Sequence, residues 1–326
     1  MSTVCIVFTR GTTLTSMRRF AGKLARALAV VLVLLVVAAG LAGLAYRPNT
    51  DIPEGAPGRH ITVHGVPIRV VQHGSGRDVL LIHGSPGSLE DWQPVVDAIG
   101  GSMRVTAYDR PGQGYSGDTG RYSYEDNADV ALALIDALQL EHVVVVGHSY
   151  GGTTGLAMAA RSPAAVDAVV VLDSALYTPS REPDVTLSLL TVPVLGMGFG
   201  ALAGPFIAPA RIRRGLVEQF AGHTPSEDFI ALRTRMWSTP KVTHAIAVET
   251  LDAAENLRRL SPKYPGIRRP VFILAEADNA FRRTTAESLR ADVPGATLDL
   301  LPGTGHFVQF EKTDDVVRAI RRAADQ

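Results

Sequence analysis

Beyond about residue 60, short apolar runs alternate along the chain with longer segments in which apolar residues recur at helical spacing. Runs such as Val79–Ile82 are continuously apolar, which is typical of strands buried on both faces of a parallel sheet. The predicted strands are Ile61–Val63, Pro67–Val71, Val79–Ile82, Val105–Tyr108, His142–Gly147, Ala168–Leu172, Val271–Ala275 and Ala296–Leu301. The predicted helices are Leu89–Ile99, Tyr124–Leu138, Tyr150–Arg161, Thr284–Ala291 and Thr313–Ala323. This alternation predicts an α/β fold with a mainly parallel sheet.

The segment from Leu176 to Arg268 interrupts the alternation, because its pattern is mostly helical. Its first part, Leu187–Pro209, is apolar and rich in glycine and proline. A helical segment between two strands of one sheet is expected to cover the end of the sheet where the ligand crevice of such folds lies. We therefore predict a core over residues 60–175 and 269–326 and a helical cap over residues 176–268.

A second long apolar segment, Ala27–Tyr46, precedes the predicted sheet and contains no charged residue. As a helix it would be about 30 Å long, which matches the hydrocarbon core of a bilayer. The residues before it include five bases and no acid: Arg10, Arg18, Arg19, Lys23 and Arg26. This asymmetry predicts a membrane segment over residues 1–46, with its N-terminus in the cytoplasm and the rest of the chain outside. Residues 47–59, with Pro48 and Pro57, are expected to be a linker.

A cleaved signal peptide is the main alternative to an anchor, with cleavage after Ala45, so that the protein would be exported. The apolar run is longer than the roughly 7–15 residues usual in signal peptides, which favours an anchor. A buried core helix in a cytosolic protein is a third interpretation, but it leaves the basic cluster unexplained. Met17 is an alternative to Met1 as the first residue.

Composition excludes several classes of protein. With 46% hydrophobic and 20% charged residues, the chain is too apolar to be disordered over most of its length. The net charge is zero, but 32 acidic residues face only 27 basic ones once the five N-terminal bases are set aside, which argues against a nucleic-acid partner. Cys5 is the only cysteine, so no internal disulfide can form. No metal-ligand spacing and no phosphate-binding loop is visible, so neither a metal nor a cofactor is expected.

The sequence Gly147-His148-Ser149-Tyr150-Gly151 is a G-x-S-x-G motif between a predicted strand and a predicted helix. That is the context in which the motif forms a sharp turn that holds a serine at the end of a strand. Ser149 is therefore the candidate nucleophile. Two backbone N–H groups are expected to stabilise the oxyanion that develops during acyl transfer: that of Tyr150 and that of Ser85, in the loop after Val79–Ile82.

A serine hydroxyl needs a base, and the base needs a carboxylate to orient it. His306 is the candidate base, because it follows the last predicted strand in a glycine-rich turn and so shares an edge of the sheet with Ser149. Asp278, which follows the strand Val271–Ala275, is the favoured acid. Asp173, directly after Ala168–Leu172, and Glu276 are the alternatives.

These features together resemble the lid-bearing branch of the α/β-hydrolase family over about residues 60–322. The matching segments are His83-Gly84-Ser85-Pro86-Gly87, Asp109–Ser116, the turn at Ser149, Asp278 and Gly305-His306-Phe307. The resemblance implies an eight-stranded sheet with helices on both faces and a helical cap inserted after the sixth strand. It also implies that Asp109–Ser116 is a structural turn.

The nucleophile narrows the chemistry. Epoxide hydrolases and haloalkane dehalogenases of this branch carry an aspartate where this chain has Ser149. A carboxylate that attacks an alkyl carbon leaves an ester that water can cleave, whereas a serine would leave a stable ether. We therefore predict a serine esterase that acts on a small or medium apolar ester through acyl-Ser149, with His306 as base and Asp278 as orienting acid.

Three other functions remain open at this point. The same residues would serve a carbon–carbon hydrolase of β-diketone-type substrates or a cofactor-free haloperoxidase-like enzyme, and the pocket would also suit a non-catalytic binder of apolar ligands. The apolar segment Leu187–Pro209 would either form the core of the cap or touch the membrane. Candidate pocket walls are the large apolar residues Trp92, Tyr150, Met197, Phe199, Phe206, Met236, Trp237 and Phe307.

Overall fold

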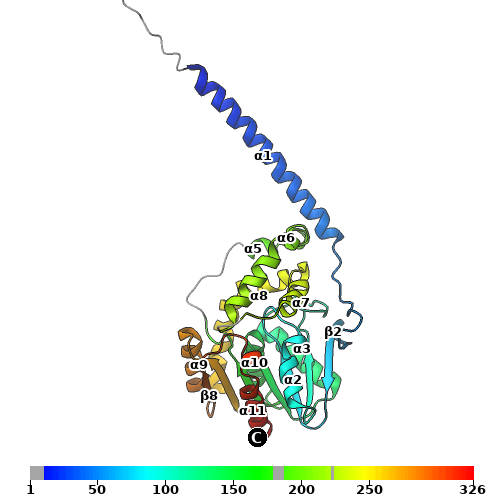
Figure 1. The fold of residues 1–326 in the computed structure, drawn as a ribbon, viewed down its shortest axis with the longest axis vertical. Coiled ribbons are helices and arrows are strands. Elements are labelled where there is room, and N and C mark those ends of the chain that lie inside the picture. Colours follow the sequence, from blue (N-terminus) through cyan, green and yellow to red (C-terminus); the bar gives the residue numbers. More distant parts are fainter. Residues whose placement is uncertain (1–10, 179–186, 222–223) are drawn as a thin grey trace, which may run out of the picture.

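The structure, a computed structural model, describes residues 11–178, 187–221 and 224–326. Its centre is an eight-stranded sheet in the order β1-β2-β4-β3-β5-β6-β7-β8. Helices lie against the sheet, a second group of helices lies beyond one end of it, and one long helix leaves the molecule on that side (Figure 1). Cys5 and Arg10 fall outside the described residues, as do residues 179–186 and 222–223 of the predicted cap.

The sheet is mainly parallel, as the sequence predicts. Its strands are β1 (Arg59–Val63), β2 (Val66–His73), β3 (Asp78–Ile82), β4 (Arg104–Tyr108), β5 (Val143–His148), β6 (Val166–Leu172), β7 (Val271–Glu276) and β8 (Thr297–Leu301). The hairpin β1–β2 turns at His64 and Gly65, and β2 pairs antiparallel with both β1 and β4. The other neighbours pair in parallel, so the carboxyl ends of β3 to β8 meet at one edge.

Helices cover both faces of the sheet. They are η1 (Leu89–Trp92), α2 (Gln93–Ile99), α3 (Tyr124–Leu138), α4 (Tyr150–Arg161), α9 (Ala280–Asp292), α10 (Val308–Glu311) and α11 (Thr313–Ala324). The valines of β5 show the two layers: Val143 and Val145 pack in a core with α3, α4 and α9, whereas Val144 and Val146 pack in a core with α2 and α11. Because successive side chains of a strand point to opposite faces, a continuous valine run fills both cores.

The chain between β6 and β7 forms a separate helical layer, which we call the cap. Its elements are α5 (Ser188–Thr191), α6 (Leu195–Gln219), α7 (Glu227–Trp237), α8 (Pro240–Leu260) and η3 (Ser261–Gly266). Its small core is Leu216, Ile230, Met236, Trp237 and Val242, together with Phe307 from the sheet domain.

Buried cations join the cap to the sheet domain. Arg110 pairs with Glu249 of α8 at 2.6 Å, and Arg233 of α7 pairs with Asp91 at 2.6 Å. All four side chains are buried, so loss of either partner would leave an uncompensated charge in the interface. The cap is therefore held in one position on the sheet domain by charged pairs as well as by apolar packing.

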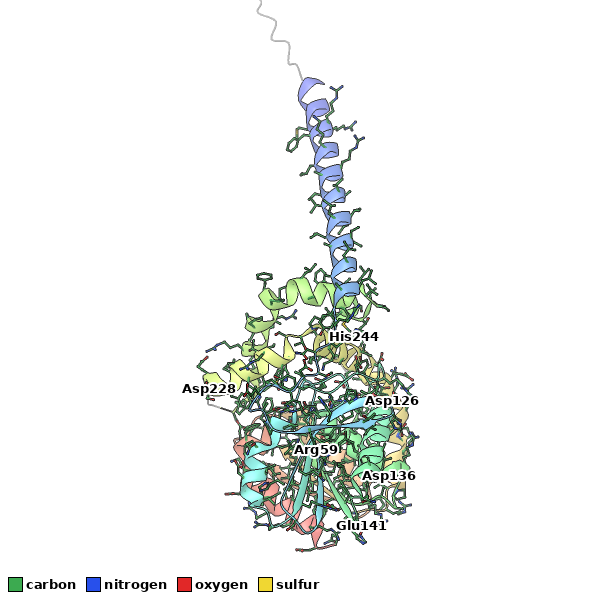
Figure 2. All side chains as sticks on the ribbon, turned by 90° about the vertical axis from the view of Figure 1, so that its right-hand side faces the viewer. Arg59, Asp126, Asp136, Glu141, Asp228 and His244 are labelled. Carbon is green, nitrogen blue, oxygen red and sulfur yellow. The ribbon has the colours of Figure 1, made fainter. Side chains whose placement is uncertain are left out.

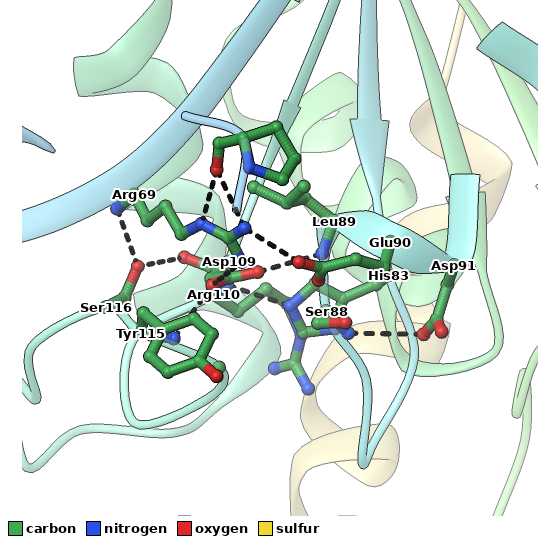
Figure 3. A network of polar contacts seen from close by, with 12 residues as sticks. Arg69, His83, Ser88, Leu89, Glu90, Asp91, Asp109, Arg110, Tyr115 and Ser116 are labelled. Carbon is green, nitrogen blue, oxygen red and sulfur yellow. Dashed lines mark hydrogen bonds and ion pairs between the residues drawn. The ribbon is translucent and has the colours of Figure 1, made fainter. Parts of the chain in front are cut away.

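The turn around Asp109 is a buried polar network next to the sheet (Figure 3). One oxygen of Asp109 accepts the Leu89 N–H at 2.8 Å, and the other accepts the Tyr115 N–H at 2.8 Å and a bond from Arg69 at 3.2 Å. Arg69 also donates to Glu90 at 2.7 Å. These bonds join the turn Asp109–Ser116 to β2 and to η1, which is the role expected of a structural turn.

The N-terminal helix α1 (Gly11–Ala45) extends away from the rest of the fold. Its side chains project outward over most of its length (Figure 2) and are exposed from Met17 to Leu35. Among the described residues, Met17–Ala45 and α6 are the two helices long and apolar enough to cross a membrane. The last turns of α1 pack against α6, so the cap is the part of the fold that meets this helix.

Candidate active site

Ser149 lies in a strained turn between β5 and α4. Its φ angle is +52°, in the region that residues with a side chain rarely adopt, and its N–H donates to the carbonyl of Leu172 at 2.8 Å. A Cβ on Gly147 would lie 2.2 Å from the carbonyl oxygen of Gly151, and one on Gly151 would lie 2.0 Å from that of Ile82. The turn therefore requires glycine at both positions, and it places Ser149 at the carboxyl end of β5, as predicted.

The imidazole of His306 lies at the same edge, in the turn between β8 and α10. Ser149 and His306 line one cavity of about 480 Å³ together with Ser85, Gln219, Glu276 and Arg282. The backbone of His306 is held on both sides: its N–H donates to the carbonyl of Gln219, and its carbonyl accepts a bond from Nε2 of His148, each at 2.8 Å. The predicted nucleophile and base thus share one cavity.

The carboxylate that meets the base is Asp173, so the prediction of Asp278 is wrong. Oδ2 of Asp173 lies 2.5 Å from Nδ1 of His306, and Oδ1 accepts the N–H of Glu276 at 3.2 Å. Asp278 instead accepts the N–H of Gly303 at 2.8 Å, in the loop that leads to His306. The reason is the strand order: β6 lies between β5 and β7, so a residue directly after β6 is the one beside Ser149.

Glu276, the other alternative for the acid, also lies at this edge but does not bond to His306. It lines the cavity, and its backbone N–H holds Asp173. Burial raises the pKa of Glu276 above its usual value, and the negative charge of Asp173 adds to this shift. Glu276 is therefore a neighbour of the acid–base pair.

Arg282, in the first turn of α9, is a site residue that the sequence did not reveal. Its Nε lies 3.4 Å from Oδ2 of Asp173, and the side chain lines the cavity. Asn279 caps α9, since its side chain accepts the backbone N–H of Arg282 at 3.2 Å. This bond fixes the position of the Arg282 backbone, from which the side chain extends into the cavity. The only available signal was position: Arg282 follows β7 within a few residues.

The environment keeps the base neutral and the acid charged. Burial lowers the pKa of His306 below its ordinary value; the bond to Asp173 opposes this shift, and the charge of Arg282 adds to it. Burial would raise the pKa of Asp173, but the bond from His306 and the charge of Arg282 hold it below its ordinary value. At neutral pH, His306 is therefore free to accept a proton at Nε2 while Asp173 remains an anion.

His148, next to the nucleophile, does not act on Ser149. It donates from Nε2 to the backbone of His306, and its ring lies 4.6 Å from the ring of His306 and 5.5 Å from that of Phe307, centre to centre. Burial, strengthened by the nearby His306, lowers the pKa of His148 to about 3. His148 thus stays neutral and holds the turn that carries the base.

The loop expected to supply one oxyanion donor is fixed by Arg110. The backbone N–H of Arg110 donates to Nε2 of His83 at 2.9 Å, and its guanidinium donates to the carbonyl of Gly84 at 2.9 Å. Ser85 follows in this loop and lines the cavity. Tyr150 is the first residue of α4, where a backbone N–H has no partner within the helix. Both predicted donors therefore lie at the edge that holds Ser149.

A second cavity of about 470 Å³ lies within the cap and is largely apolar. Gln219 lines both cavities, and the adjacent residues Ser85 and Pro86 line one each. Of the predicted pocket walls, Phe199 and Trp237 line this second cavity.

The other predicted walls do not line either cavity among the residues that the structure describes. They are Trp92, Tyr150, Met197, Phe206, Met236 and Phe307. Trp92 is fully buried in the core with α2 and α11, and Met236 and Phe307 belong to the small core of the cap. Phe206 is 85% exposed on the outer surface of α6. Large apolar residues mark cores more often than sites, and a sequence does not separate the two.

Within the described residues, no group of three or more His, Cys, Asp or Glu side chains is placed to hold a metal ion. The arrangement at this edge consists of a serine in a strained turn, a neutral histidine and a buried carboxylate, with the positions predicted to supply backbone donors, Ser85 and Tyr150, at the same edge. It can perform nucleophilic acyl transfer.

Comparison with known proteins gives a consistent result. Residues 79–319 match the alpha/beta hydrolase family. The chain is 32% identical over 298 residues to a haloalkane dehalogenase of Agrobacterium fabrum, across 84% of this chain and 93% of that protein. It is 26% identical over 286 residues to a 2-(acetamidomethylene)succinate hydrolase of Mesorhizobium japonicum, across 82% and 95%. The solved structure of the dehalogenase DatA from Agrobacterium tumefaciens superimposes with a TM-score of 0.68 at 21% identity, across 85% and 100%.

Proposed function

The chain belongs to the alpha/beta hydrolase family, and from that premise we propose that it is a serine hydrolase that cleaves carboxylic esters through an acyl-Ser149 intermediate. The observation that carries the proposal is the 2.5 Å contact between Asp173 and Nδ1 of His306, the histidine that lines the same cavity as Ser149. This contact leaves Nε2 of His306 for the serine proton.

The reaction follows from these positions. Oγ of Ser149 attacks the acyl carbon while Nε2 of His306 takes its proton, and the N–H groups of Ser85 and Tyr150 stabilise the oxyanion. The intermediate collapses as His306 returns the proton to the leaving alcohol. Water then attacks the acyl carbon, His306 takes a proton from the water, and Ser149 leaves with that proton. Asp173 keeps the imidazole in one orientation throughout.

The nucleophile argues against the activity for which one relative, the haloalkane dehalogenase, is named. The two relatives are named for different reactions, so similarity alone does not select the chemistry. A dehalogenase reaction at this site would require Ser149 to displace a halide from an alkyl carbon and form an ether that water does not cleave. Acyl chemistry avoids this dead end, because an acyl-serine ester hydrolyses.

The two cavities indicate which ester would fit. The cavity with Ser149 is lined by polar side chains, including Gln219, Glu276 and Arg282. The cavity in the cap is lined by apolar side chains, including Phe199 and Trp237. We infer an ester whose apolar acyl chain enters the cap and whose polar alcohol portion lies beside Arg282.

We further propose that α1 is retained as a membrane anchor, with the catalytic domain outside the cytoplasm. The charge-free run Ala27–Tyr46 is long enough to span a bilayer, and the bases Arg18, Arg19, Lys23 and Arg26 all precede it. The contact between α1 and α6 supports retention, because cleavage after Ala45 would expose the surface of α6 that α1 covers. Intact mass of the protein extracted from membranes tests this directly.

A fluorophosphonate probe tests the nucleophile. It should label the wild type and fail to label Ser149→Ala, while Ser85→Ala, which removes a hydroxyl from the same cavity but keeps the backbone donor, should still be labelled. Labelling of Ser149→Ala at the wild-type rate would overturn the proposal.

A panel of p-nitrophenyl esters from acetate to laurate, measured beside a β-diketone, tests the reaction class. Turnover of esters without cleavage of the diketone supports the esterase. Cleavage of the diketone alone would replace it with a carbon–carbon hydrolase that uses the same residues.

A further inference from the structure

The cap helix α6 has an apolar outer surface. Its exposed large apolar side chains include Leu195, Phe199, Leu202, Phe206 and Ile207, and the neighbouring α5 adds Leu189. Phe206 is 85% exposed, which is unusual for a phenylalanine on the surface of a soluble domain. This patch lies on the side of the molecule where α1 leaves it (Figures 1 and 2).

α1 and α6 cross at very short range. A Cβ on Gly198 of α6 would lie 1.7 Å from the carbonyl oxygen of Ala39, and one on Gly43 of α1 would lie 1.9 Å from that of Val194. Only glycine at both positions lets the two backbones approach this closely. The start of α6 is therefore fixed at one position along the axis of α1, at residues 39–43. We call this position its height along α1.

That height lies within the stretch of α1 that would span a membrane. A bilayer core needs about 20 apolar residues, and the charge-free run Ala27–Tyr46 supplies no surplus beyond that number. If the run spans the core, Ala39 lies about 10 Å below its outer end, since each residue of a helix rises 1.5 Å. The N-terminal turns of α6 that touch Ala39 are then drawn into the outer leaflet.

The second half of α6 fits the boundary between lipid and water. Arg211, Arg213 and Arg214 follow the apolar patch and are exposed, and Arg213 pairs with Glu227 of α7 at 2.6 Å. A helix with an exposed apolar surface and adjacent arginines is typical of helices that lie in the plane of a membrane surface. α6 does not cross the bilayer, because its other side packs on α7 and α8 within the cap.

We propose that α6 lies in the outer interface of the bilayer that α1 spans, so that the apolar cavity of the cap opens onto lipid. Phe199 and Ile207 support the second part, because each is both exposed on this surface and part of the cavity lining. The ester then reaches Ser149 from the membrane, acyl chain first. This inference rests on the proposed anchor and, for the substrate route, on the proposed esterase activity.

Depth measurement tests the location without using activity. The full chain, with Cys5→Ser to remove its only cysteine, is reconstituted in vesicles of phosphatidylcholine and phosphatidylglycerol at three to one. A nitroxide is attached at Val36→Cys in α1, at Phe206→Cys, or at Arg321→Cys in α11, at the opposite end of the molecule (Figure 1). Collisions with oxygen report contact with lipid, and collisions with a water-soluble nickel chelate report contact with water.

We expect the labels at 36 and 206 to favour oxygen and the label at 321 to favour nickel. Water exposure at 206 with lipid contact at 36 would overturn this inference and leave the anchor intact. Water exposure at 36 would overturn the anchor, and this inference with it. Spin–spin broadening at 206 would show a second copy of the chain on the patch in place of lipid, which also overturns it.

Substrate access supplies a second measurement. Phe206 does not line either cavity, so Phe206→Asp should leave the hydrolysis of soluble p-nitrophenyl acetate within about twofold. It should reduce hydrolysis of a long-chain ester embedded in the same vesicles by about tenfold or more, because a buried phenylalanine contributes roughly 1.5–3 kcal/mol. Equal loss on both esters would contradict the lipid route. Absence of hydrolysis in the wild type would contradict the esterase and leave the depth result standing.

Discussion

The polar cavity that Ser149 lines and the apolar cavity of the cap are built in different ways. The polar cavity is made mainly by loops at the carboxyl ends of parallel strands, and residues 218–221 of the cap close it. Hydrogen bonds to the backbone fix its acid–base pair, as at His306 and Asp173. The apolar cavity is made by the sides of cap helices, where packing alone positions residues such as Phe199. The first arrangement sets the position of reacting atoms, and the second sets the shape and polarity of what can reach them.

The largest expected effect separates two aspartates of the polar cavity's edge. Asp173→Asn should reduce kcat by about 10⁴, because an amide cannot hold the imidazole in the tautomer that accepts the serine proton. Asp278→Asn should stay within about twofold, because Asp278 holds only the N–H of Gly303. The ester panel measures both variants. A greater loss of kcat in Asp278→Asn than in Asp173→Asn would show that Asp278, the residue that the sequence favours, is the orienting acid.

The next effect concerns the interface between the sheet domain and the cap. Glu249→Ala should lower the free energy of unfolding by about 3–5 kcal/mol, because it leaves the buried Arg110 without its partner. Glu255→Ala, on the same helix, removes an exposed pair with Arg258 and should not move the midpoint of urea unfolding measurably. Equal midpoints for the two variants would mean that the pair between Arg110 and Glu249 does not stabilise the contact between the cap and the sheet domain.

A smaller effect should affect the apolar cavity and spare the polar one. Ala203→Phe places a ring in the cap cavity and should reduce hydrolysis of decanoyl and longer esters by about 30-fold to 100-fold, roughly the value of a few buried methylenes. Hydrolysis of the acetate should be unchanged. Ala210→Phe, at an exposed position of the same helix, is the control. Equal loss for acetate would show that the two cavities are not separable in function.

The smallest effect is a shift in pH dependence. Only neutral His306 accepts the serine proton, so kcat/KM should rise with pH through the pKa of His306 and level off near neutrality. The charge of Arg282 helps to hold this pKa down, so Arg282→Gln should move the acidic limb to higher pH. Arg283→Gln, which removes a bond to the carbonyl of Ala277, should leave the limb in place. A shift to lower pH in Arg282→Gln would refute the role assigned to that charge.

The elements of the sheet could be predicted because their signals are local. The valine run of β5 indicates a buried strand, and the glycines around Ser149 indicate a tight turn. Both signals can be read from a few consecutive residues without knowledge of the rest of the fold. The order of the strands is a property of the whole fold, and the choice between Asp173 and Asp278 depends on it. Both follow a strand closely, and only the adjacency of β5 and β6 shows which one meets His306.

The buried ion pair between the cap and the sheet domain could not be predicted from the sequence for a related reason. Glu249 lies 139 residues after Arg110, and nothing in either local sequence indicates that they pair in a buried interface. Trp92 shows the opposite error, because the sequence predicts a pocket wall at this large aromatic residue near a functional loop, whereas Trp92 is part of the core. Contacts between distant segments are set by how layers stack, and a single sequence does not carry that information.

The glycine crossing between α1 and α6 bears on whether the N-terminal helix can be exchanged. A spanning helix that served only as a tether would be replaceable by any other of the same length. Here Gly43 lies against the carbonyl of Val194, directly before α6, and Gly198 lies against the carbonyl of Ala39 in α1. A foreign anchor with any other residue at position 43 would bring a side chain to within 2 Å of the Val194 carbonyl, so the end of α1 around residues 39–43 belongs to the packing of the cap and cannot be exchanged freely.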